Sequence, residues 1–76
     1  MTELRFHRGL YDATAIDEAA ATFADYATLE RADDATHLVV RVTSSDGARE
    51  RKVAAELANF ALGLTIRKGG TVGATA

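Results

Sequence analysis

The side chains with the greatest chemical potential in this sequence are two histidines, His7 and His37. Each belongs to a stretch in which apolar and polar residues alternate, so we expect the histidines on two separate strands, near one another if they share a sheet face. Neither has a neighbouring cysteine or a second histidine four residues away, which are common spacings of zinc ligands. Two incidental surface histidines are therefore the simpler interpretation.

The carboxylates and hydroxyls form no catalytic pattern either. Asp17 suits the first turn of a helix, and the pair Asp33 and Asp34 suits a solvated loop tip. Ser44 and Ser45 lie outside any Gly-x-Ser-x-Gly elbow. We predict no catalytic, cofactor-binding or metal-binding residue, and hence a protein that is not an enzyme.

Composition narrows the classes of protein further. The chain has 76 residues, nine basic and eleven acidic side chains, a net charge of −2 and no cysteine. Its length fits one domain, and its charge argues against a nucleic-acid binder, which needs a basic face. The basic run from Arg49 to Lys52 is interrupted by Glu50, which is typical of a solvated helix face. We expect no membrane span and no secretory signal, and hence a cytoplasmic protein.

The spacing of the larger apolar side chains predicts five elements. Asp12 or Thr14 can cap the first helix, and Gly63 lies inside the second, where we expect a close contact or a local distortion. The predicted elements are a strand over 3–9, a helix over 14–25, strands over 26–31 and 37–43, and a helix over 48–67. These elements make a single α+β domain over residues 1–68, followed by a flexible C-terminal tail over 69–76.

The order β-α-β-β-α predicts how the elements assemble. A right-handed crossover with the third strand inserted between the first two gives a three-stranded antiparallel sheet of order 1-3-2. Both helices then cover one face in a two-layer sandwich, with the most apolar strand in the centre. We expect Tyr26, His37, Val39 and Arg41 on the other face, which is either solvated or an interface.

Two segments resemble the His-Xaa-Ser system protein D family. The first, over 10–26, has a tyrosine, an alanine-rich helix and a Phe-x-Asp ending. The second, over 56–67, is similar to the closing helix of the family, with Leu57 in place of an aromatic residue and Gly63 in place of an acid. The positions that match this second pattern are Glu56, Asn59, Leu62, Ile66 and Arg67. The resemblance implies an accessory protein encoded beside radical-SAM enzymes in a peptide-modification system.

The leading hypothesis is a non-catalytic interaction protein without a cofactor, which binds a peptide or a modifying enzyme. A peptide, or a second copy in a homodimer, could add a strand to a sheet edge and rest on the open face. We predict that Tyr26, His37, Val39 and Arg41 contact the partner. One alternative is a small ligand-binding protein or enzyme whose site, shared across a homodimer, gathers His7, His37, Tyr26 and Arg41. Another is an antitoxin-like regulatory partner.

Overall fold

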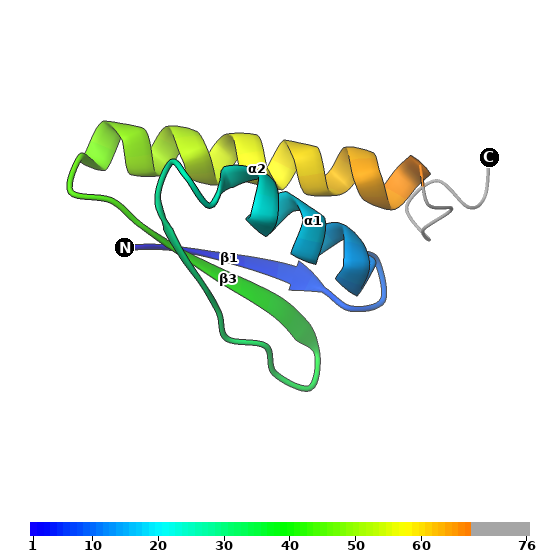
Figure 1. Ribbon diagram of the computed structural model, residues 1–76. Helices are drawn as coiled ribbons and strands as arrows, with labels where there is room; N and C mark the ends of the chain where they lie inside the picture. Colours follow the sequence, from blue (N-terminus) through cyan, green and yellow to red (C-terminus); the bar gives the residue numbers. More distant parts are fainter. Residues whose placement is uncertain (68–76) are drawn as a thin grey trace.

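The computed structural model describes residues 1–67, and the predicted tail over 69–76 lies outside the described residues. In chain order the elements are β1 (Thr2–His7), α1 (Ala13–Phe23), β2 (Thr28–Arg31), β3 (His37–Thr43) and α2 (Gly47–Arg67) (Figure 1). The predicted order of elements is confirmed, and strand β3 has the predicted bounds. Strand β2 begins two residues later than the sequence pattern indicated, which removes Tyr26 from the sheet.

The three strands form one antiparallel sheet in the order β1-β3-β2, as predicted. In the register between β1 and β3, Leu4 lies opposite Val40 and Phe6 opposite Leu38. In the register between β2 and β3, Leu29 lies opposite Val42.

Neither helix of the described residues combines the length and hydropathy that a bilayer crossing requires.

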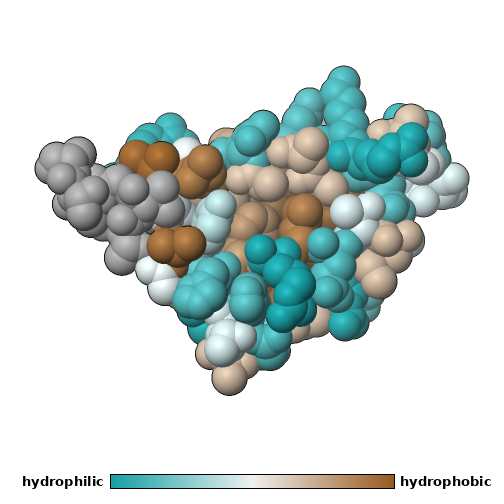
Figure 2. Space-filling view, turned by 180° about the vertical axis from the view of Figure 1, so that it is seen from behind, coloured by the Kyte–Doolittle hydropathy of each residue, from teal (hydrophilic) through white to brown (hydrophobic). Residues whose placement is uncertain are grey.

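The core lies between the sheet and the two helices. Alternate residues of β3 point their side chains toward the helices, because successive side chains of a strand alternate between its faces. Helix α2 packs on both β1 and β3, whereas α1 packs on β3 and against α2. The largest members of this core are Phe6, Ile16, Leu38, Val40, Val42, Val53 and Leu57. Seen from behind, the molecule also shows hydrophobic surface in the middle of the face, framed by hydrophilic side chains (Figure 2).

An aspartate directly precedes each helix and caps its first turn. Of the two predicted caps of α1, Asp12 is the one used, since its Oδ2 accepts a hydrogen bond from the Ala15 N–H at 3.1 Å. The Oδ1 of Asp46 accepts bonds from the N–H groups of Ala48 and Arg49, at 3.0 and 3.3 Å. These bonds satisfy donors that the first helical turn leaves without a partner.

Glu50 does not belong to a solvated helix face, contrary to the sequence pattern. The residue is 9% exposed, and its carboxylate accepts hydrogen bonds from Thr2 Oγ1 at 2.8 Å and from the Ser44 N–H at 3.1 Å. Both bonds lower the pKa of Glu50 below its ordinary value, and the bond from Thr2 has the larger effect. One carboxylate therefore ties the start of β1 to the segment between β3 and α2.

Candidate partner-binding groove

Three of the four predicted contact residues, His37, Val39 and Arg41, lie on the sheet face opposite the helices. The charges on this face pair with one another. Arg41 Nε donates to Glu3 Oε2 at 3.1 Å, and Arg5 lies 3.5 Å from Glu3 Oε1 and 3.1 Å from Asp34 Oδ2. The hydrogen bond from Arg41 is the main reason that the pKa of Glu3 falls below its usual value. A partner that uses these charges would have to compete with the existing pairs.

Val39 lies on the same face but is only 1% exposed. Arg5 is on β1 and Asp34 follows β2, so the ion pair between them crosses the central strand β3. In the strand register Arg5 is directly opposite Val39. The side chain of Arg5 therefore lies next to the valine, and we infer that its aliphatic stem contributes to the burial of Val39, so that a partner could reach Val39 only if this ion pair moves.

The two histidines do meet on the sheet. They are cross-strand partners, and their ring centroids lie 5.3 Å apart in an edge-to-face arrangement. His7 Nδ1 accepts a bond from the Gly9 N–H at 3.0 Å, and His37 Nδ1 lies 2.8 Å from Thr36 Oγ1. Residues 1–67 hold no group of three or more side chains suited to a metal ion. The histidine pair is thus joined to its local turns through one nitrogen of each ring.

Asp33 and Asp34 organise the turn between β2 and β3, where the sequence suggested only a solvated tip. Asp34 Oδ1 accepts from the N–H groups of Thr36 and His37 at 2.8 and 2.7 Å, and these two bonds hold the pKa of Asp34 far below its ordinary value. Asp33 accepts two bonds from the Arg31 guanidinium, at 3.1 and 2.7 Å. Both carboxylates are therefore structural.

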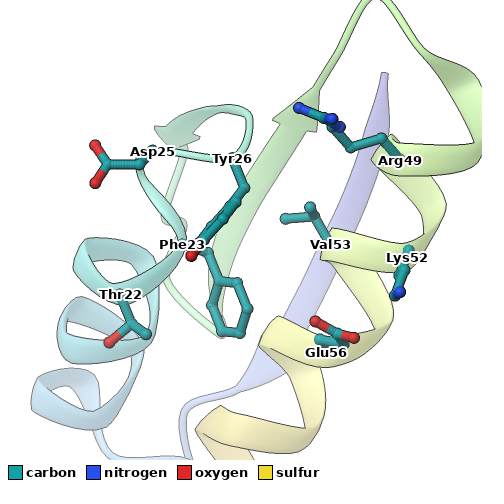
Figure 3. A pocket seen from close by; sticks show the side chains of 8 residues that line it. All are labelled: Thr22, Phe23, Asp25, Tyr26, Arg49, Lys52, Val53 and Glu56. Atoms are coloured by element: carbon teal, nitrogen blue, oxygen red, sulfur yellow. The ribbon is translucent and has the colours of Figure 1, made fainter.

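The fourth predicted residue, Tyr26, lies on the other side of the molecule from the open sheet face. The chain turns at the end of α1, where the Tyr26 N–H donates to the Phe23 carbonyl at 3.0 Å. This turn places the Tyr26 ring beside Phe23, across the groove from α2 (Figure 3). The prediction that Tyr26 shares the face of Arg41 is wrong, because the strand starts only at Thr28. His7, His37, Arg41 and Tyr26 therefore do not converge within one chain.

Tyr26 instead belongs to a groove of about 750 Å³ between the end of α1 and the first half of α2. Hereafter "the groove" means the surface formed by Thr22, Phe23, Asp25, Tyr26, Arg49, Lys52, Val53 and Glu56 (Figure 3). Phe23 is half-buried and forms the base of the groove. The centroid of its ring lies 6.2 Å from that of Tyr26 and 5.9 Å from that of Phe60. Tyr26 is 57% exposed, so the groove presents an aromatic surface to solvent.

Four charged side chains surround this aromatic surface: Asp25, Arg49, Lys52 and Glu56. Within residues 1–67 none of the four forms an ion pair, in contrast to the charges of the open face. Both histidines lie on the opposite layer, and the Thr22 hydroxyl already donates to the Glu18 carbonyl at 2.8 Å. The groove thus offers apolar contact and free charges of both signs, and no paired nucleophile and base.

The sequence pattern pointed to one groove residue, Tyr26, and missed the others. Arg49, Val53 and Glu56 follow the i, i+4, i+7 spacing of one helix face, and Phe23 lies three residues before Tyr26. That spacing was the available signal. It did not show that these two surfaces face each other, because the packing of α1 against α2 is a tertiary feature.

Searches for similar proteins give no relative of this chain: no family model, curated protein or solved structure matches it. The resemblance to His-Xaa-Ser system protein D remains a prediction from the residues.

Proposed function

We propose that this protein is a non-catalytic interaction module that binds a peptide segment of a partner protein in the groove. The observation that carries the proposal is an exposed aromatic side chain, Tyr26, surrounded by charged groups that have no ion-pair partner in residues 1–67. Tyrosine and arginine are among the residue types that most often contribute strongly to protein interfaces. Tyr26 and Arg49 combine them in one concave surface.

The expected ligand segment follows from the chemistry of the groove. An apolar side chain of the peptide would pack on Tyr26 and Val53, and flanking charges of both signs would meet Arg49 and Glu56. An aromatic side chain buries about 200 Å² when fully covered, so the exposed half of Tyr26 offers roughly 100 Å². At about 25 cal/mol per Å², covering it contributes at most about 2.5 kcal/mol to binding.

A role as an accessory protein in a peptide-modification system agrees with this proposal. In that setting the bound segment would belong to the modified peptide or to the modifying enzyme. The proposal does not depend on the family resemblance, because the groove was derived from the positions of its own side chains.

The test is selection of binders from a random peptide display library, followed by affinity measurement on variants. We expect Tyr26→Ala and Arg49→Gln to weaken the selected peptides about tenfold or more, and Tyr26→Phe to retain most of the affinity. Arg67→Gln is the matched control, since it removes the same charge from the same helix outside the groove. Circular dichroism verifies that each variant is folded.

Two outcomes would contradict the proposal. A library that yields no binder above background shows that the groove does not take peptides. Equal losses in Arg49→Gln and Arg67→Gln show that net charge, rather than the groove, determines binding.

A further inference from the structure

Strand β1 forms one edge of the sheet, and its outward backbone groups can be assigned from one hydrogen bond. The Arg8 N–H donates to the Thr36 carbonyl at 2.9 Å, so the backbone groups of Arg8 point toward β3. Backbone direction alternates along a strand, so those of Leu4 and Phe6 also point inward. The N–H and C=O groups of Glu3 and Arg5 therefore lie in the plane of the sheet and point away from β3, toward the free edge.

We propose that this edge pairs with β1 of a second copy of the chain, in an antiparallel register centred on Leu4. A two-fold axis at Leu4 places Glu3 of each copy opposite Arg5 of the other, twice in the interface. Residues directly opposite share a sheet face, and opposite charges in that position stabilise a pair of strands. Within each copy Glu3 already pairs with Arg41, and Arg5 with Asp34, so the new pairs extend this network or replace part of it. The surface is complementary to itself, as a two-fold interface requires.

Neighbouring registers lack this complementarity. A shift that centres the two-fold axis on Glu3 puts two carboxylates opposite each other, and a shift to Arg5 does the same with two guanidinium groups. The Leu4 register also makes Glu3 and Arg5, the two residues with outward backbone groups, a hydrogen-bonded pair. Backbone direction allows all three registers, because each places outward-pointing residues opposite one another, and side-chain charge then selects the Leu4 register among them.

The position of α2 agrees with a joined sheet. Helix α2 packs on both β1 and β3, and for the joined sheet we place its axis midway between them. Strands are about 4.8 Å apart, which places the two α2 axes roughly 10 Å apart across the two-fold axis. Packed helices have interaxial distances of 8–10 Å. The two helices would therefore lie side by side without a gap or a clash.

The flank of α2 that would meet its copy carries small side chains. Val53, Glu56 and Phe60 face α1 or the groove, and Leu57 faces the sheet. Helical spacing places Ala58 and Leu62, both partly buried, beyond the sheet-facing row, next to Ala54, which is already buried in the core of its own chain. Glu50 contacts Thr2, so a helix rise of 1.5 Å per residue puts Ala54 at about the level of Leu4.

The decisive experiment uses two charge variants, each followed by analytical ultracentrifugation over a concentration series. Glu3→Arg makes positions 3 and 5 both positive, and Arg5→Glu makes them both negative. We expect each variant alone to self-associate about tenfold more weakly than the wild type, and their mixture to recover association as a heterodimer. A wild type that stays monomeric at millimolar concentration, or a mixture that stays monomeric, overturns the proposal.

A cross-link tests the register, since the chain has no native cysteine. The two-fold axis places Leu4 opposite its own copy in a non-hydrogen-bonded pair, where Cα atoms lie about 4.5 Å apart, within the range of a disulfide. Leu4→Cys should give a disulfide dimer under mild oxidation. Leu29→Cys, a partly buried leucine on the other edge strand, is the matched control and should cross-link far less. Equal yields from the two variants would refute pairing through β1.

Discussion

Gly63 lies in the interior of α2, four residues before its last residue, Arg67. The close contact or distortion expected there is not found: a Cβ added at Gly63 meets no atom within 4 Å, and the backbone is not left-handed. The glycine therefore has no steric reason in the described chain. Replacing it by alanine removes the entropic cost of glycine in a helix, about 1 kcal/mol in an unfrayed interior.

We expect Gly63→Ala to stabilise the protein by about 0.5–1 kcal/mol, the lower value applying if the last turn frays. For a domain of this size, 1 kcal/mol raises the Tm by about 4–8 °C. Thermal and urea unfolding, monitored by circular dichroism at one fixed protein concentration, measure the change. The urea m-value should stay constant, since the surface exposed on unfolding does not change.

The matched comparison is Gly9→Ala. A Cβ at Gly9 would lie 3.0 Å from His7 Nδ1 and 3.1 Å from His7 Cε1, so alanine must displace the ring or the turn. We expect the two glycine substitutions to shift the Tm in opposite directions. An unchanged or lower Tm for Gly63→Ala would refute the assignment of open space around Gly63.

Three other substitutions test the packing, the capping and the electrostatics. Leu57→Ala removes a fully buried side chain and should cost about 2–5 kcal/mol in urea unfolding. Asp12→Ala removes the cap of α1 and should cost about 1 kcal/mol in the same assay. The pKa of Glu50 is lower in the folded state than its ordinary 4.5, so its contribution is complete above that pH and is lost as the pH falls below it. The Tm of Glu50→Gln should therefore fall less between about pH 5 and pH 3 than that of the wild type; parallel pH profiles would contradict this role.

The fold could be predicted because the strongest local patterns agreed with one another. The alternation over β3 and the helical spacing over α2 are long enough to define type and direction, and the crossover rule then orders the strands. The start of β2 could not be fixed in this way, since Tyr26 has the high strand propensity of an aromatic residue yet serves a helix-ending turn. That error moved Tyr26 to the wrong face.

The positions of the charged residues were the least predictable part of the structure. Glu50 has the same local surroundings in sequence as an exposed helix residue, and only the arrival of Thr2 and Ser44 makes it a buried acceptor. Asp34 is held in its turn by the local N–H groups of Thr36 and His37, but its ion pair with Arg5, 29 residues away in the chain, is also a long-range contact. Such long-range contacts leave no periodic signal, so the groove and the open-face charges emerged only from the tertiary structure.

Val39 is buried although it lies on the sheet face that no helix covers. Helices cover one side of β3. On the other side only Val39 is buried, next to the Arg5–Asp34 pair, while Arg41 and Thr43 are exposed, so the cover is local. A domain of this length buries only roughly 60–65% of the surface that its unfolded chain exposes, so even a local cover adds to a small core. The amide protons of β3 should accordingly exchange with solvent more slowly than those of either edge strand, and added salt should narrow that difference by loosening the ionic cover.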